Sequence, residues 1–476
     1  MGLKVANNAF GTLNAGITSS DTAIILQAGE GARFPTLTAG DYFYATLIDT
    51  SNNLEIVKVT ARSTDTMTVE RGADSTTARA FSTNDRFELR PTAALFNEKA
   101  NDADVVATYL PKAGGTMTGA LVTPMVVTDS SMNFRNRIIN GDMRIDQRNA
   151  GAAVTVSGSY SVDRFPIVNS TDGAFSAQQD SSAPAGFVTS LKYTTTTADA
   201  SLSASQYSFI DQWIEGTNVA DLAWGTANAK TVTLSFWVRS SLTGTFGGAL
   251  RNSDNNRSYP FTYTVSVADT WEYKTVTIPG DTSGTWLTTT GRGMACNFGL
   301  GVGTDFSNTA GAWAVANYLS ATGAVSVIGT LNATWYVTGV QLEVGSVATP
   351  FERLDYGRQL IQCQRYYARI TSGTGASTVK TAFGVGLAVA TNSANLLVLA
   401  PVTMRAFPTF NYSSVDFTDS TNYDAAVSAI TEATYSNNGV RIKVTTANTM
   451  TQYRPGSLVA NYASASAGYV EFSAEV

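Results

Sequence analysis

The stretch Thr231-Val-Thr-Leu-Ser-Phe-Trp-Val-Arg239 indicates the fold class, because apolar and polar side chains alternate along it without a break. A period of two is that of a β-strand with one buried face. The apolar set on one face is Val232, Leu234, Phe236 and Val238. Residues 270–278 and 333–343 behave similarly. We therefore expect residues 126–352 to form a two-sheet sandwich of the jelly-roll type.

A smaller β domain is predicted before this region. Leu54-Glu-Ile-Val-Lys-Val-Thr60 and Thr66-Met-Thr-Val-Glu70 also alternate, and Ser63-Thr64-Asp65 supplies a turn between them. Residues 1–92 are thus expected to form a sandwich or barrel of their own. Pro91 then opens a helix-forming run that reaches Asn101. This helix begins a linker that we assign to residues 93–125.

The linker contains a glycine-rich segment, Leu110-Pro-Lys-Ala-Gly-Gly-Thr-Met-Thr-Gly-Ala-Leu121. Glycines this close together mark tight turns or a close approach of backbones. Spacing alone favours an ordinary hairpin turn here.

A third β region is expected over residues 353–476, after a helix from Leu354 to about Gln364. The buried side of that helix is expected to be Leu360, Ile361 and Cys363. The chain ends in an alternating strand whose apolar face is Val470, Phe472, Ala474 and Val476. The predicted fold class is therefore all-β, with short helical linkers.

Composition and charge exclude several classes of function. Charged residues make up 14% of the chain, and the net charge is −6. With no Lys/Arg run, the sequence lacks the basic surface that nucleic-acid binding needs. The longest apolar runs, such as Asn395–Pro401, are too short for a transmembrane helix, so no membrane insertion is expected. The N-terminus shows no apolar signal segment, which predicts synthesis in the cytoplasm.

The sequence contains no histidine, which excludes Ser-His-Asp and Cys-His nucleophile systems and nearly all catalytic zinc sites. Cys296 and Cys363 could form one disulfide, but isolated cysteines are more often free and buried. No dense acidic cluster occurs, and no metal or cofactor is predicted.

Several segments together resemble bacteriophage tail-fibre and receptor-binding proteins. They are Val69-Glu-Arg-Gly72, Thr76–Ala80, Phe87–Ala93, the glycine-rich segment 110–121, Arg137-Ile-Ile-Asn-Gly-Asp-Met-Arg-Ile-Asp-Gln-Arg148, Ile214–Gly216, Val232–Ser240, Gly339–Gly345, Tyr356-Gly-Arg-Gln-Leu-Ile-Gln-Cys-Gln-Arg-Tyr-Tyr367, Pro401–Ala406 and the final strand. The central segments look like the jelly-roll domain of fibre tips, which is similar in architecture to carbohydrate-binding modules.

This resemblance implies a location in the virion tail and a homotrimer. Residues 1–92 would attach to a baseplate or tail protein, and residues 353–476 would form a distal domain that stabilises the trimer or contacts the receptor. Gly114, Gly115 and Gly119 would let three backbones approach one axis. The implied partner outside the virion is a host surface glycan, held by multivalent binding. The shaft over residues 93–125 is short for a fibre.

Glycan binding needs aromatic side chains that stack on sugar faces, with polar groups for the hydroxyls. The candidate glycan-binding residues are Trp237, Arg239, Trp335, Gln341, Trp286, Trp313, Tyr412 and Tyr453. The first four would line a groove if their faces belong to one exposed sheet; otherwise Trp237 and Trp335 are core residues. Trp286 and Trp313 stand in loop-like stretches. The tyrosines lie among small polar residues and could equally be surface or trimer-interface residues.

An enzymatic function would depend on carboxylates, since a glycosidase needs two of them at ~5–10 Å. Asp211 and Glu215 share a face if their segment is helical, but Phe209-Ile-Asp-Gln-Trp-Ile214 is rich in strand formers. We therefore predict no enzymatic activity. Two alternatives stay open: a tailspike depolymerase that cuts host polysaccharide, and a purely structural baseplate or connector protein.

Overall fold

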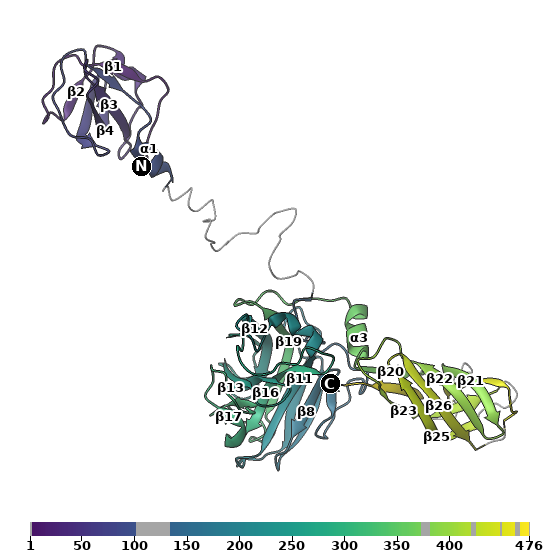
Figure 1. The fold of residues 1–476 in the computed structure, drawn as a ribbon. Coiled ribbons are helices and arrows are strands. Elements are labelled where there is room, and N and C mark those ends of the chain that lie inside the picture. Colours follow the sequence, from purple (N-terminus) through teal and green to yellow (C-terminus); the bar gives the residue numbers. More distant parts are fainter. Residues whose placement is uncertain are drawn as a thin grey trace. The chain divides into compact units, whose positions relative to one another are not determined.

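The computed structural model describes residues 2–100, 134–372, 381–419, 425–447, 450–461 and 467–475. The chain divides into two compact units, Met1–Val126 and Val127–Val476 (Figure 1). Almost every described element is a β-strand, so the predicted all-β fold class is confirmed. The α-helices of the described residues are α1 (Ala93–Ala100) and α3 (Tyr356–Gln364). The division at residues 92, 125 and 352 stays a prediction.

The first unit contains one six-stranded sheet of order β1-β6-β3-β4-β5-β2. Its strands are β1 (Phe10–Thr12), β2 (Ala23–Ile25), β3 (Phe43–Ile48), β4 (Leu54–Ser63), β5 (Thr66–Ala73) and β6 (Arg86–Glu88). Phe34, Phe43 and Phe87 pack together in its core. The helix predicted after Pro91 corresponds to α1. The glycine-rich segment, with Gly114, Gly115 and Gly119, lies outside the described residues.

The second unit begins with a two-sheet sandwich, as the alternating stretches predict. One sheet has five strands in the order β15-β12-β19-β10-β9, and the other has six in the order β14-β13-β16-β11-β8-β7. The strands are β7 (Tyr160–Val162), β8 (Phe165–Asn169), β9 (Ala174–Asp180), β10 (Ser190–Thr197), β11 (Tyr207–Glu215), β12 (Val232–Ser240), β13 (Gly244–Asn252), β14 (Ser258–Val265), β15 (Glu272–Ile278), β16 (Arg292–Val302) and β19 (Thr334–Val344). Short parallel strands β17 (Ser307–Asn308) and β18 (Ser320–Ala321) lie in the loops.

The core lies between the two sheets, and both contribute to one hydrophobic cluster. The apolar set of β12 is fully buried in it, which confirms the face that the alternation predicts. Phe236 of the five-stranded sheet meets Phe298 of the six-stranded sheet at 5.0 Å between ring centroids. Free thiols are found at Cys296 and Cys363, and both are buried, so no disulfide forms.

The distal region follows α3 with a three-stranded sheet, β20-β28-β23, and a closed barrel, β21-β22-β26-β25-β24-β27. The strands are β20 (Tyr367–Thr371), β21 (Ala382–Ala390), β22 (Ser393–Leu399), β23 (Thr409–Ser413), β24 (Val415–Thr418), β25 (Ala425–Ser436), β26 (Gly439–Thr446), β27 (Pro455–Ala460) and β28 (Tyr469–Ser473). The expected apolar face of the last strand is confirmed at Val470, Phe472 and Ala474, which are buried. Val476 lies outside the described residues.

Helix α3 corrects one prediction. Its N-cap is Asp355, whose carboxylate accepts the backbone N–H of Arg358 at 3.0 Å. The buried residues are Gln359 and Cys363, whereas Ile361 is 56% exposed. Ile361 is about 200° around the helix from Gln359, so it faces the opposite side. Gln359 is held there by a 2.6 Å hydrogen bond to the Asp142 carboxylate.

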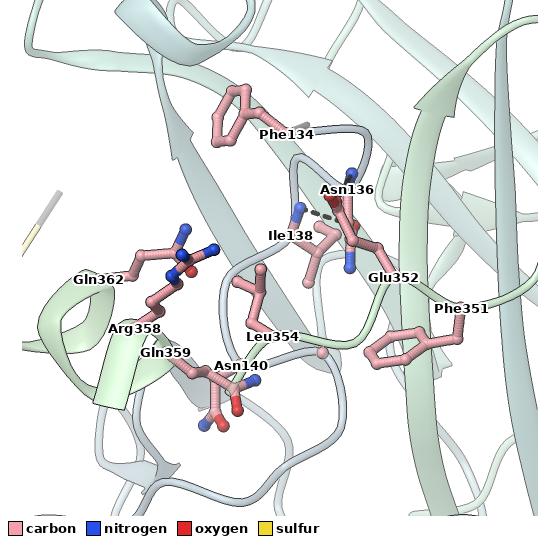
Figure 2. A pocket seen from close by; sticks show the side chains of 11 residues that line it. Phe134, Asn136, Ile138, Asn140, Phe351, Glu352, Leu354, Arg358, Gln359 and Gln362 are labelled. Atoms are coloured by element: carbon pink, nitrogen blue, oxygen red, sulfur yellow. Dashed lines mark hydrogen bonds between the residues drawn. The ribbon is translucent and has the colours of Figure 1, made fainter. Parts of the chain in front are cut away.

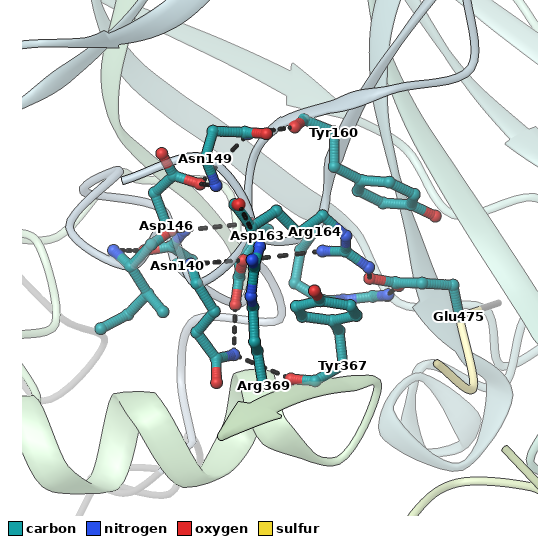
Figure 3. Close-up of polar contacts among 12 residues, drawn as sticks. Asn140, Asp146, Asn149, Tyr160, Asp163, Arg164, Tyr367, Arg369 and Glu475 are labelled. Atoms are coloured by element: carbon teal, nitrogen blue, oxygen red, sulfur yellow. Dashed lines mark hydrogen bonds and ion pairs between the residues drawn. The ribbon is translucent and has the colours of Figure 1, made fainter. Parts of the chain in front are cut away.

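Ion pairs join the sandwich to the distal region (Figure 3). Glu475 contacts Arg164 and pairs with Arg148 Nη2 at 2.9 Å. The Arg148 guanidinium lies 4.3 Å from the ring centre of Tyr160 and 3.5 Å from that of Tyr367. Tyr367 belongs to β20 and Tyr160 to β7, so this cluster fixes the start of the distal sheet against the edge of the sandwich.

Candidate functional site

A pocket of about 450 Å³ lies over the outer face of the six-stranded sheet. Four alternate residues of β11 line it: Tyr207, Phe209, Asp211 and Trp213. Their neighbours Ile210 and Ile214 belong to the core cluster on the other face. The period of the strand therefore directs three aromatic rings and one carboxylate outward. The volume falls within the ~300–1,000 Å³ typical of ligand pockets.

Other strands and loops complete the wall. The remaining lining residues are Gly158, Tyr160, Pro166, Val168, Arg251, Asn255, Arg292, Phe306, Asn317 and Leu319. Tyr207 meets Phe306 edge to face, with 5.1 Å between ring centroids. The Arg292 guanidinium lies 4.9 Å from the centre of the Trp213 ring. The pocket thus combines flat apolar surfaces with hydrogen-bonding groups.

Arg251 forms the polar floor of the pocket and is held on several sides. Its Nε donates to Asn297 Oδ1 at 2.9 Å, and its Nη1 donates to Asn255 Oδ1 at 2.9 Å and to Asn317 Oδ1 at 2.7 Å. Its Nη2 lies 3.7 Å from Asp211 Oδ2. A long, flexible side chain is thereby fixed before any ligand arrives, which lowers the entropic cost of binding.

Asp211 is buried and incompletely paired. Its Oδ1 has no hydrogen-bond partner among the described residues, and neither has Nδ2 of Asn297. Burial raises the pKa of Asp211 to about 6, although Arg251 and then Arg292 act to lower it. Buried polar atoms without partners are uncommon and often mark functional sites.

The carboxylates considered for catalysis are not brought together. Asp211 and Glu215 both lie on β11, which is a strand as predicted. Four residues along a strand span roughly 13 Å, beyond the separation that glycosidases use. Glu215 accepts hydrogen bonds from Arg365 Nε at 2.9 Å, Arg365 Nη2 at 2.7 Å and Tyr366 Oη at 2.8 Å. Its carboxylate is therefore part of the junction with the distal region.

The groove predicted from Trp237, Arg239, Trp335 and Gln341 does not form. Trp335 is fully buried, and its Nε1 donates to Tyr263 Oη at 3.1 Å inside the sandwich. Trp237 lies on the outer face of the same sheet, half-buried and 5.4 Å from the Tyr273 ring. Arg239 donates to Ser182 Oγ at 2.9 Å. These residues lie on the five-stranded sheet, outside the pocket described above.

A β-bulge explains why Trp335 and Gln341 do not share a face. The pairing of β12 with β19 shifts between Ser235, which faces Gln341, and Trp237, which faces Thr338. Gly339 takes a φ of +63° within this bulge. The extra residue reverses the alternation along β19. Gln341 is buried beneath residues 349–352, and its Oε1 accepts the N–H of Glu352 at 2.7 Å.

Trp286 and Trp313 lie in loops, as predicted, and both take part in aromatic packing. With Trp224 they form a trio whose ring centroids lie 4.7 to 5.6 Å apart. Trp286 is buried, and Trp313 is half-buried with its Nε1 bonded to the Pro279 carbonyl at 2.8 Å. The three rings meet edge to face, with interplanar angles of 79° to 84°. Their contact with a glycan stays a prediction.

The distal tyrosines differ from each other. Tyr412 is half-buried and packs against the core of the distal region. Tyr453 is 72% exposed. Their contact with a glycan stays a prediction.

A signal for the pocket is present in the sequence but is ambiguous. In Tyr207-Ser-Phe-Ile-Asp-Gln-Trp-Ile214 aromatic residues recur at every second or fourth position, yet the intervening positions are partly apolar too. Such a strand has no obvious outer face from its pattern alone. Arg251, Arg292 and Asn317 come from separate strands and loops, which only the fold brings together.

A second pocket, of about 280 Å³, lies between α3 and the segment from Phe134 to Gly141 (Figure 2). Several of its polar groups are already used within the protein. Glu352 accepts the N–H of Asn136 at 2.7 Å, and Asn136 Nδ2 donates to the Val340 carbonyl at 3.0 Å. This pocket is therefore part of the interface between the sandwich and α3.

Among the described residues, no helix is both long enough and apolar enough to cross a membrane. The same residues contain no group of three or more His, Cys, Asp or Glu side chains placed to hold a metal ion.

No family model and no curated protein matches this sequence. Solved structures are similar to parts of it. The enzymatically active domain of tailspike protein 4 from bacteriophage CBA120 has 12% identity and a TM-score of 0.25 over 44% of this chain and 21% of that one. The carbohydrate-binding module TmCBM61, in complex with β-1,4-galactotriose, has 7% identity and a TM-score of 0.23, and the match covers 44% of this chain and 99% of that module. The family 11 carbohydrate-binding module of Clostridium thermocellum has 11% identity and a TM-score of 0.22, and the match covers 42% of this chain and all of that module.

Proposed function

We propose that the pocket over β11 binds a carbohydrate, and that the chain is a tail-fibre protein which attaches a bacteriophage to host surface polysaccharide without cutting it. The observation that carries the binding proposal is one pocket wall with Tyr207, Phe209 and Trp213 beside the fixed guanidinium of Arg251. The viral role is supported by the sequence segments that resemble tail fibres.

The physical basis is the two-sided chemistry of a sugar. One face of a pyranose ring carries C–H groups that pack on aromatic rings, and its edge carries hydroxyls that need hydrogen-bond partners. Arg251, Asn255 and Asn317 already form a connected network at the pocket floor, and Asp211 adds an acceptor. Preformed polar groups of this kind fix the orientation of a ligand.

The non-catalytic part of the proposal is supported by the acidic groups at the site. Asp211 is the single carboxylate among the residues that line the pocket. Hydrolysis by a pair of acids requires a second one at ~5–10 Å. The nearest candidate in sequence, Glu215, is held by Arg365 and Tyr366.

Attachment would then come from several weak sites acting together. In the proposed homotrimer, three pockets on one virion part raise the effective concentration for the second and third contacts. Residues 1–92 would hold the tail or baseplate partner, and the distal region would stabilise the trimer or add receptor contacts.

The test uses the full chain and an array of purified bacterial surface polysaccharides, with binding and polymer length measured in the same samples. Trp213→Ala should weaken binding at least tenfold, a loss of ~1.4 kcal/mol. Trp237→Ala is the matched control, since that half-buried tryptophan lies on the other sheet. Thermal unfolding of both variants shows whether they fold.

Binding with unchanged polymer length, sensitive to Trp213 alone, supports the proposal. Shortened polymer would overturn its non-catalytic part and favour a tailspike depolymerase. Binding to none of the polysaccharides by a folded protein would favour a structural connector.

A further inference from the structure

The charges that line the pocket do not cancel. The charged residues of its wall are Arg251, Arg292 and Asp211. Arg251 faces the Asp211 carboxylate at 3.7 Å, so these two form a pair. Arg292 is exposed, and no carboxylate of the described residues lies within ion-pair distance of it. One guanidinium is therefore left over at the pocket.

The residue that could neutralise Arg292 is already engaged. Arg292 on β16 is the cross-strand neighbour of Glu215 on β11. The Glu215 carboxylate instead pairs with Arg365 at 2.7 Å. By contrast, Arg257 is matched with Asp281 at 2.5 Å. The Arg292 guanidinium lies over an aromatic ring of the pocket wall, 4.9 Å from the centre of Trp213.

We infer that the sugar bound in this pocket is acidic, of the uronic-acid type, and that Arg292 binds its carboxylate. This inference rests on the proposed carbohydrate site. A guanidinium presents a planar set of donors that matches a carboxylate in a bidentate contact. Trp213 would hold the apolar face of the same sugar residue, because the ring and the cation are adjacent.

The charge balance favours a singly charged group. One surplus guanidinium neutralises one carboxylate, whereas a phosphate monoester brings nearly two negative charges close to Asp211. The chain as a whole carries a net charge of −6, which repels a polyanion at long range. At physiological salt that repulsion is screened beyond ~8 Å, so the contact at Arg292 decides the preference.

The experiment uses the full chain and one surface polysaccharide that contains uronic acid, tested in native form and after chemical reduction of its carboxylates to primary alcohols. Wild-type protein should bind the native polymer at least tenfold more tightly than the reduced polymer. Arg292→Met should lose this preference while keeping the weak binding to the reduced polymer. Arg358→Met, which changes another exposed arginine outside this pocket, should behave as wild type.

Equal wild-type affinity for the native and reduced polymers would overturn the inference. So would an Arg292→Met variant that weakens binding to both equally, or equal binding to a sulfated polymer without carboxylates. Trp213→Ala separates this failure from failure of the proposed function. If Trp213→Ala weakens binding to the reduced polymer, the carbohydrate site stands and only the acidic preference falls. If it changes binding to neither polymer, the site itself is refuted.

Discussion

Replacing Glu215 with alanine should destabilise the second unit strongly. Its buried carboxylate accepts two hydrogen bonds from Arg365, one from Tyr366 Oη at 2.8 Å and one from Thr217 Oγ1 at 3.1 Å. The side chain connects the end of β11 to the start of the distal region. Removing it leaves a buried hydroxyl and a guanidinium without their acceptor.

The expected cost is about 3 kcal/mol of unfolding free energy. Breaking a buried ion pair from one side typically costs ~3–5 kcal/mol. The lower end applies because the Arg365 side chain is 36% exposed and can regain water contacts. The buried Tyr366 hydroxyl also loses its acceptor, and an unsatisfied buried hydroxyl costs roughly 1–3 kcal/mol. The expected loss of unfolding free energy therefore does not fall below about 3 kcal/mol.

The pH dependence has a defined sign. Burial acts to raise the pKa of Glu215, but hydrogen bonds from Arg365 and Tyr366 outweigh it and leave the pKa below the ordinary 4.5. The folded state therefore prefers the ionised carboxylate, and this stabilisation is present above pH 4.5. It is lost as the pH falls through the lowered folded pKa. The difference between wild type and Glu215→Ala should shrink over that range.

Urea unfolding followed by tryptophan fluorescence measures this effect. All seven tryptophans lie between Trp213 and Trp335, so the signal reports on the sandwich. Arg358→Ala is the control, because its pair with Asp355 has side chains 76% and 63% exposed and should contribute under ~1 kcal/mol. A loss below ~1 kcal/mol for Glu215→Ala, matching the control, would refute the reasoning.

Three further predictions concern stability and reactivity. Burial, opposed by Arg148, raises the pKa of Asp163 to about 6. The contribution of Asp163 to stability is therefore full at low pH and is lost as the pH rises from 3.8 through 6. In urea unfolding, wild type should lose more stability than Asp163→Asn between pH 5 and 7, and parallel curves for the two proteins would contradict this. Burial raises the pKa of both thiols, Cys296 and Cys363, so neither should react with a thiol reagent before the protein unfolds. Rapid labelling of the native protein would contradict their burial. Trp335→Ala should cost ~3–5 kcal/mol and half-buried Trp237→Ala clearly less; equal midpoints in urea would show that the two residues are buried alike.

Local patterns were enough where a strand alternates without interruption. The face of β12 and that of the last strand were predicted correctly, because each side chain along a regular strand points opposite to its neighbour. Helix α3 was located correctly as well. Of its predicted buried side, Cys363 is buried and Leu360 packs against the core, but Ile361 is exposed. Gln359 is buried instead, held by a hydrogen bond to Asp142, a residue far away in the sequence.

The sequence by itself determined that the chain is all-β, that no histidine chemistry occurs, and that its strands have apolar faces to bury. Tertiary structure alone decided which aromatic rings are exposed. One bulge at Gly339 separates Trp335 from Gln341, since a single extra residue reverses every later side chain of the strand. The pocket is likewise a product of pairing: β11, β13 and β16 are neighbours in the sheet although they are far apart in the chain, and this places Trp213, Arg251 and Arg292 around one space.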